Sequence, residues 1–194
     1  MTDQSQDNTL ASFIVKLLSC PVFTFGLVTL ASAFSLFLAF FAEAFLELEP
    51  CILCIYQRYP FALGLACGLI GLGVRKHTGA ARLLFIIAAL GFLANSSIAL
   101  YQTGVELGWW DTGLEACSVT IFMDDNSEQS ILENVMSSPM SSCGDVQWVD
   151  PVLGLSMANY NIAFSLGLCI FCLLAAFFVP AAMRKQPDGT RNEN

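Results

Sequence analysis

Charged residues are scarce in this sequence. Lys, Arg, Asp and Glu together make up 12% of the 194 residues, whereas typical soluble domains contain about 25%. The apolar fraction is 56% and the mean hydropathy is +0.65, which argues against both a soluble globular domain and a disordered chain. The length corresponds to one domain, at about 150 residues per domain. The composition therefore points to a membrane protein.

Basic residues and histidine are scarcer still. The chain has 8 Lys and Arg against 16 Asp and Glu, which gives a net charge of −8. This balance argues against a nucleic-acid partner, because phosphate binding requires clustered basic side chains. His77 is the single histidine, so a metal site built from several histidines is excluded.

Long apolar runs take the place of charge. A bilayer core about 30 Å thick is crossed by roughly 20 apolar residues in a helix. Four runs meet this requirement, at residues 21–42, 55–74, 83–101 and 159–179. We therefore expect an all-α integral membrane protein, in which residues 1–194 form a single membrane domain with a four-helix transmembrane bundle. Cleavage of the first run as a signal peptide is the alternative, but its 22 residues exceed the apolar core of about 7–15 residues found in signal peptides.

The distribution of basic residues predicts the orientation of the four spans. Cytoplasmic loops carry an excess of Lys and Arg, and seven of the eight basic residues lie before span one, between spans two and three, or after span four. The other two connections, a short acidic one at residues 43–54 and a long one at 102–158, contain no basic residue. We therefore expect both termini on the cytoplasmic side and two loops outside. The seven residues are Lys16, Arg75, Lys76, Arg82, Arg184, Lys185 and Arg191.

The second outer loop is too long for a simple connector. Residues 128–136 place apolar side chains on one helical face, which predicts a short helix that either lies on the membrane surface or packs on the top of the bundle. Three tryptophans near the expected interface are interpreted as membrane anchors. They are Trp109, Trp110 and Trp148.

The eight cysteines fall into two groups by their expected depth. Cys20 lies at the inner boundary and Cys67, Cys169 and Cys172 lie within spans, where we expect the in-span thiols to pack as small apolar side chains. The other group lies on the outer side, where disulfides are permitted. This outer group consists of Cys51, Cys54, Cys117 and Cys143.

Cys51 and Cys54 form a C-x-x-C motif just before the second span. The spacing allows the two sulfur atoms to bond, and a helix N-terminus favours a thiolate by lowering its pKa. Both effects suit a pair that cycles between dithiol and disulfide. Half of a zinc site is the alternative, although Cys117 and Cys143 do not supply a second C-x-x-C. A permanent structural disulfide is the alternative for Cys117 and Cys143.

Arg58 is the only charged residue inside the four runs. It lies four residues after Cys54, on the same helix face, and a charge within a span is functional by default. It would stabilise a thiolate or hold the carbonyl oxygen of a membrane-dissolved electron acceptor, although snorkelling to the headgroups is the simpler alternative. Two cysteine pairs and a buried cation together suggest an electron relay to a quinone.

The sequence resembles the disulfide bond formation protein B (DsbB) family of membrane thiol:quinone oxidoreductases. The resemblance covers about residues 20–183 and rests on three segments. These are the Cys-Ile-Leu-Cys-Ile-Tyr-Gln-Arg run at 51–58, the Tyr-Gln-Thr-Gly-Val-Glu-Leu-Gly-Trp-Trp run at 101–110, and the Cys-Gly-Asp-Val-Gln-Trp run at 143–148, which is followed by Leu-Gly-Leu-Ser-Met-Ala at 153–158 and by Asn161.

This resemblance implies an enzyme of the bacterial inner membrane whose reactive cysteines face the periplasm. The implied redox disulfides are Cys51–Cys54 and Cys117–Cys143. A periplasmic thioredoxin-fold thiol oxidase (DsbA-like) would attack Cys117, Cys143 would pass the electrons to Cys51, and Cys54 would face a membrane quinone, either ubiquinone or menaquinone. Arg58 matches the family arginine that supports quinone binding. The role is a family property, since this system keeps the bacterial periplasm oxidising.

The sequence departs from the family pattern at two positions. Gln102 stands where relatives of this type carry His, and Gln57 stands where some carry Glu, so neither is placed among the catalytic residues. A vitamin K epoxide reductase-like enzyme is a neighbouring alternative, but the early position of the C-x-x-C favours DsbB. A membrane scaffold with structural disulfides is the non-enzymatic alternative. A transporter would need polar groups at midplane on several spans.

Overall fold

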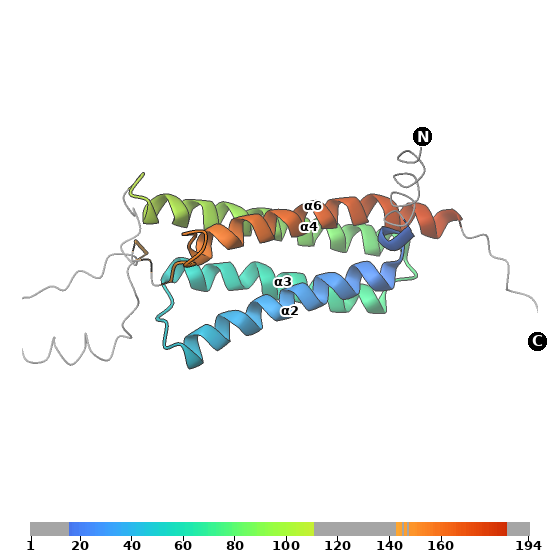
Figure 1. Ribbon diagram of the computed structural model, residues 1–194. Helices are drawn as coiled ribbons and strands as arrows, with labels where there is room; N and C mark the ends of the chain where they lie inside the picture. The colour runs from blue at the N-terminus through green and yellow to red at the C-terminus, as the bar shows by residue number, and fades with distance from the viewer. Residues whose placement is uncertain (1–15, 111–142, 145, 147, 186–194) are drawn as a thin grey trace, which may run out of the picture.

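The computed structural model describes residues 16–110, 143–144, 146 and 148–185. Within this part of the chain it contains four long helices (Figure 1), which confirms the expected all-α architecture. All four are long and apolar enough to cross a membrane. The helices are α2 (Pro21–Phe45), α3 (Ile52–Gly73), α4 (Thr78–Glu106) and α6 (Met157–Lys185).

The helices are longer than the apolar runs. The added turns carry polar residues of the candidate site. Helix α3 begins at Ile52, three residues before the expected start, so that Cys54 lies in its first turn. Helix α4 continues beyond Tyr101 to Glu106. A spanning helix has to satisfy its own backbone hydrogen bonds at the membrane boundary, so the helical backbone continues where the side chains become polar. The expected surface helix lies outside the described residues.

Consecutive helices run in opposite directions, so each end of the bundle contains one end of every helix. Helix α2 packs mainly on α3, α3 on α4, and α4 on α6. The start of α2 and the end of α6 lie at the same end of the bundle as the turn between α3 and α4 (Figure 1). That turn carries Arg75, Lys76 and His77. The arrangement agrees with the alternation of basic residues along the sequence.

The half of the bundle nearer the turn between α3 and α4, which we call the inner half after the expected topology, is a close-packed core. The rings of Phe25 on α2 and Phe85 on α4 stack with centroids 4.1 Å apart. Helix α3 approaches this pair through Gly71, where a Cβ atom would collide with the Phe25 ring. The three cysteines of the spans belong to the same core, which confirms their expected role as packing residues. They are Cys67, Cys169 and Cys172, and all three are buried.

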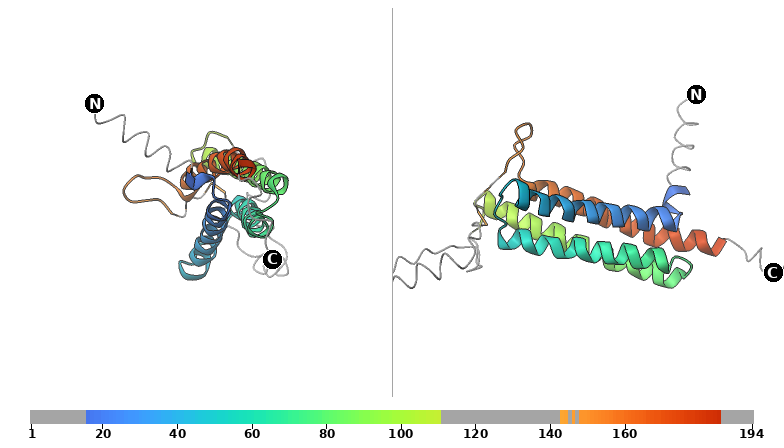
Figure 2. Two further views of the ribbon diagram at one scale, coloured as in Figure 1. Left: turned by 90° about the vertical axis from the view of Figure 1, so that its right-hand side faces the viewer. Right: turned by 90° about the horizontal axis from the view of Figure 1, so that it is seen from below.

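Helix α2 diverges from the other helices toward its C-terminal end. Figure 2 shows it leaning away from α6 and α4 at the end that leads to α3. Its contacts with α6 are correspondingly few. The divergence opens a space among the outer halves of α2, α3 and α6, and the candidate site lies in this space.

Candidate active site

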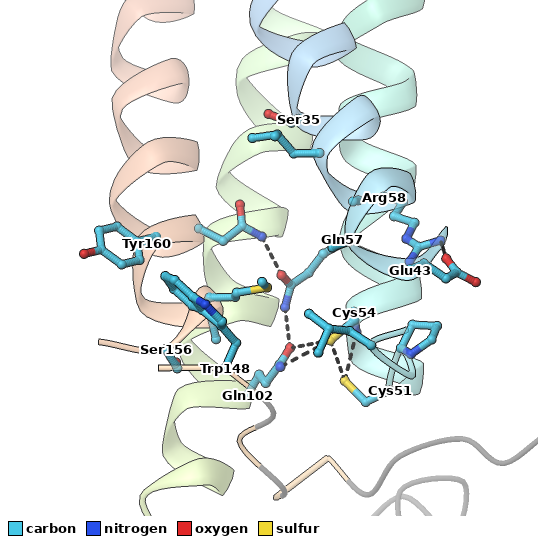
Figure 3. Close-up of a pocket in the computed structure, with 18 of the residues that line it drawn as sticks. Ser35, Glu43, Cys51, Cys54, Gln57, Arg58, Gln102, Trp148, Ser156 and Tyr160 are labelled. Atoms are coloured by element: carbon cyan, nitrogen blue, oxygen red, sulfur yellow. Dashed lines mark hydrogen bonds and ion pairs between the residues drawn. The ribbon is translucent and has the colours of Figure 1, made fainter. Parts of the chain in front are cut away.

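A cavity of about 730 Å³ occupies the outer half of the bundle. Its walls come from the last three turns of α2, the first turns of α3 and the start of α6, and they are mostly apolar. Polar side chains gather at its outer end, as Figure 3 shows. These polar residues include Glu43, Cys51, Cys54, Gln57, Arg58, Gln102 and Glu106.

The C-x-x-C pair lies at the outer end of this cavity. Cys51 is the N-cap of α3, and its extended backbone allows its sulfur to accept a hydrogen bond from the backbone N–H of Cys54 at 3.2 Å. Both residues are free thiols, and their sulfur atoms are 2.7 Å apart. The two sulfurs are thus in direct contact, and a disulfide between Cys51 and Cys54 stays a prediction.

The helix N-terminus does not lower the pKa of both thiols. Hydrogen bonding to the Cys54 side chain and burial together raise the pKa of Cys51 above its ordinary value. Two backbone N–H groups act in the opposite direction but are outweighed. At Cys51 the hydrogen bond with Cys54 outweighs the effect of the helix N-terminus, and burial of the sulfur adds to the rise in pKa.

Cys143 lies beside this pair. It is almost fully buried, and it packs in one apolar cluster with Cys51, Leu53 and Val105. It is disulfide-bonded, whereas Cys51 and Cys54 are not. The structure therefore brings together three of the four cysteines singled out in the sequence. The fourth, Cys117, lies outside the described residues, and its pairing with Cys143 stays a prediction.

Arg58 turns into the bundle and meets a carboxylate from α2. Its Nη1 lies 2.8 Å from Oε2 of Glu43, and its guanidinium lies 4.9 Å from the centre of the Phe40 ring. The side chain is 19% exposed, and its carboxylate partner lies near the end of α2. Its Nε is buried and has no hydrogen-bond partner among the described residues. Arg58 thus lines the cavity and keeps one buried donor without a partner among the described residues.

Sequence reasoning missed a chain of amides that leads to Cys54. Gln57 Nε2 donates to Gln102 Oε1 at 2.7 Å, and Gln102 Nε2 contacts Cys54 Sγ at 3.4 Å. Asn161 on α6 donates in turn to Gln57 Oε1. The signal for these residues was present, since buried amides in otherwise apolar spans need partners. Gln57 and Gln102 had been set aside because they depart from the family pattern.

The amide chain ends at the Glu106 carboxylate on one side and at the Asn95 side chain on the other. Glu106 Oε1 accepts from Gln102 Nε2 at 3.2 Å, one helical turn away, and its Oε2 accepts from the Ser156 hydroxyl. On α4, Asn95 donates to Ser165 Oγ at 2.8 Å and to Asn161 Oδ1 at 3.3 Å. Three helices are therefore tied together by polar groups around the reactive thiols.

The three tryptophans are placed differently from one another. Trp109 is largely exposed, as an interface anchor would be. Trp110 instead folds back on α4, where its Nε1 donates to the Tyr101 carbonyl at 3.2 Å and its ring covers Gly104. Trp148 lines the cavity and lies near Tyr160. Within the described residues, no group of three or more His, Cys, Asp or Glu is arranged to hold a metal ion.

Comparisons with known proteins match one family over most of the chain. A family model described as "Disulfide bond formation protein DsbB" matches residues 21–175. Disulfide bond formation protein B of Xanthomonas campestris is 32% identical over 156 residues, which cover 76% of this chain and 86% of that protein. Its counterpart in Xylella fastidiosa is 30% identical over 154 residues, with coverages of 77% and 84%.

A third relative, an uncharacterized protein of Rickettsia prowazekii, is 26% identical over 163 residues, which cover 84% of this chain and 88% of that protein. No solved structure matches the chain at a significant level.

Proposed function

Because the chain belongs to the DsbB family of disulfide bond formation proteins, we propose that it reoxidises a periplasmic dithiol oxidase and passes the electrons to a membrane quinone. The family and the four helices establish a multi-pass membrane protein of disulfide formation. The proposal adds the donor, the acceptor and the route between them. The partner would be a thioredoxin-fold protein of the DsbA type.

One observation carries the proposal: Cys143 and the Cys51–Cys54 pair pack together at the outer end of a membrane-level cavity. A relay requires its two cysteine pairs within reach of each other, because thiol–disulfide exchange proceeds through direct attack of sulfur on sulfur. It also requires that one pair faces the acceptor. Cys54 lines the cavity and is less buried than Cys51, which meets this second requirement.

The proposed exchange balances two electrons at each step. A thiolate of the partner attacks Cys117, a mixed disulfide forms and Cys143 is released as a thiolate. The partner's second thiolate then attacks the mixed disulfide, so that the partner leaves oxidised and both Cys117 and Cys143 are reduced. Cys143 next attacks Cys51 of the oxidised Cys51–Cys54 pair and releases Cys54. Cys117 resolves this second mixed disulfide, which restores the Cys117–Cys143 bond.

The cavity fits a quinone in size and chemistry. Its apolar walls suit an isoprenoid compound, and Arg58 Nε is an unpaired buried donor that a carbonyl oxygen would satisfy. Arg58 and the amides of Gln57 and Gln102 would hold the head group. A bound quinone supplies two-electron oxidation of the Cys51–Cys54 dithiol.

The orientation follows from the distribution of charge. We place the end of the bundle with Cys51, Cys54 and Cys143 in the periplasm and the basic turn between α3 and α4 in the cytoplasm. The membrane is then the bacterial inner membrane. The outer side is the oxidising compartment in which disulfides persist.

The decisive experiment is quinone reduction by the purified protein with a reduced DsbA-like partner, for the wild type and for Cys54→Ala. We expect turnover that is abolished in the variant, because the dithiol can no longer form a disulfide. Cys172→Ala is the matched control, since Cys172 is buried in the core on the inner side of the bundle. Failure of the wild type with both ubiquinone and menaquinone would overturn the proposal.

A further inference from the structure

The segment that follows Cys143 forms a small hairpin with an apolar tip. Val149 and Ser156 pair as an antiparallel bridge, and Asp150 N–H donates to the Leu155 carbonyl at 2.9 Å. Gly154 adopts a positive φ of 66°, which only glycine adopts readily. We call residues 149–156 the outer hairpin. Its tip is Pro-Val-Leu-Gly, without a charged residue.

The tip exposes apolar side chains to an unusual degree. Val152 is 84% exposed and Leu153 is 65% exposed, and Val149 and Leu155 at the base are exposed as well. The hairpin's one carboxylate is held by three hydrogen bonds. Asp150 accepts hydrogen bonds from the backbone N–H groups of Val152 and Leu153 and from the Tyr160 hydroxyl. The one charge of the hairpin is therefore fixed at its base, whereas the apolar side chains of the tip are exposed.

The direction of the outer hairpin indicates what the apolar side chains of its tip would contact. In both views of Figure 2 the segment projects sideways from the bundle, across the helix axes. In Figure 1 it lies beside the start of α6, at the level where α3 begins. Because the four helices cross the bilayer, a segment at right angles to them runs along the membrane plane. The level of the first turn of α3 is the boundary of the apolar span.

We propose that the outer hairpin inserts its tip into the outer leaflet and anchors the second outer loop to the lipid. The occupant is lipid because the apolar tip projects sideways from the bundle, across helices long and apolar enough to span a membrane. Trp148 and Tyr160 at the base, with ring centres 6.4 Å apart, are the residue types enriched at the headgroup level. This inference does not depend on the proposed electron route.

The anchored hairpin would hold Cys143 in position beside Cys51. Cys143 lies only a few residues before the hairpin and is buried against Cys51 and Val105. An anchored hairpin fixes the C-terminal side of Cys143 at the membrane surface. A pull on the loop by a bound partner would then be resisted on this side and would not draw Cys143 away from Cys51.

Photocrosslinking in a bilayer tests the proposal. The full chain is placed in nanodiscs of phosphatidylethanolamine and phosphatidylglycerol, with p-benzoylphenylalanine in place of Leu153, of Val152 or, as the control, of Glu47, which is exposed in the first outer loop and does not line the cavity. After irradiation, lipid adducts are quantified by mass spectrometry. We expect at least fivefold more adduct at 153 and 152 than at 47. Equal yields at the three positions would overturn the proposal.

A second measurement separates lipid from protein as the occupant. A reduced thioredoxin-fold protein is added before irradiation. If it captures the crosslink at 153 and removes the lipid adduct, the tip is a protein-docking surface and the lipid anchor is wrong.

The charged double variant Val152→Asp, Leu153→Asp removes the apolar tip without touching a packed side chain. We expect protease cleavage within residues 149–156 to become at least fivefold faster in nanodiscs, while cleavage in the turn between α3 and α4 stays unchanged. Unchanged cleavage of the hairpin would also overturn the proposal.

Discussion

At the scale of single residues, the site is defined by what each polar side chain faces. Arg58 faces the cavity on one side and Glu43 on the other. A carboxylate that takes one guanidinium nitrogen leaves the remaining donors pointing in fixed directions. Glu43 is therefore a positioning residue for Arg58, and the sequence contained no pattern that paired the two, since they lie on different helices.

We expect Glu43→Gln to weaken quinone binding. A partly exposed ion pair contributes about 1 kcal/mol at most, so the KM for quinone should rise by up to about fivefold while kcat changes less. Steady-state kinetics with a short-chain quinone measure this split. Glu47→Gln is the matched control, because Glu47 follows α2 and is exposed. An equal effect of both variants would show that net charge, not the ion pair, is responsible.

Asp150 gives a pH dependence to the outer hairpin. Hydrogen bonds from Tyr160 and from the backbone of Val152 hold the pKa of its carboxyl below the usual value. A depressed pKa in the folded state stabilises the hairpin above the ordinary Asp pKa of about 3.9, and this contribution is lost as the pH falls through the lower folded value. The hairpin should therefore loosen only in acid.

Tryptophan fluorescence in nanodiscs between pH 6 and pH 2 measures this transition, because Trp148 lies beside Tyr160. We expect the wild type to change at the acid end and Asp150→Asn to show no such step. Trp148→Phe should remove the signal, which assigns it to the hairpin. A transition that persists in Asp150→Asn would contradict the assignment.

At the scale of helices, packing depends on how closely two backbones approach. Small residues permit close contact in membrane bundles, and α3 presents Gly64, Gly68 and Gly71 to its neighbours. Gly71 faces Phe25, which cannot move aside because it is stacked on Phe85. The inner half of α2 is held by this contact, whereas its outer half diverges.

Gly71→Ala should therefore destabilise the bundle. Overpacking a close-packed core costs typically about 1–3 kcal/mol, and the added Cβ would meet the Phe25 ring. Thermal unfolding in detergent, followed by the circular dichroism of the helices, measures the loss of stability. Gly73→Ala is the matched control, since no atom lies within 4 Å of a Cβ at that position. Equal midpoints for the two variants would show that Phe25 yields without cost.

The elements also show how far sequence reasoning reached. The four apolar runs predicted the helices, because hydrophobic length is a strong signal in a bilayer. The helix ends were missed, because backbone hydrogen bonding continues into polar sequence. That error mattered for the site: the extension of α4 to Glu106 places Gln102 within a helix and one turn from a carboxylate. The Arg58–Glu43 pair required the packing of α2 on α3, which no local pattern encodes.

At the scale of the whole molecule, the proposed orientation makes two ends of the bundle accessible from opposite sides. Cys20 is exposed at the start of α2, and Glu49 is exposed at the other end. In chains that keep a single cysteine, a membrane-impermeant thiol reagent added to spheroplasts should modify Glu49→Cys and spare Cys20. Inverted membrane vesicles should give the reverse pattern. The same side for both positions would contradict the topology.

The divergence of α2 has a consequence for how the proposed quinone reaches the cavity. In the proposed orientation, a cavity with mostly apolar walls between α2, α3 and α6 would exchange its quinone with the lipid phase and not with the surrounding water. The concentration that governs turnover is then the mole fraction of quinone within the bilayer, and encounter is diffusion in two dimensions. Diluting proteoliposomes with buffer should leave the turnover number constant, whereas adding empty lipid to the same vesicles should lower it.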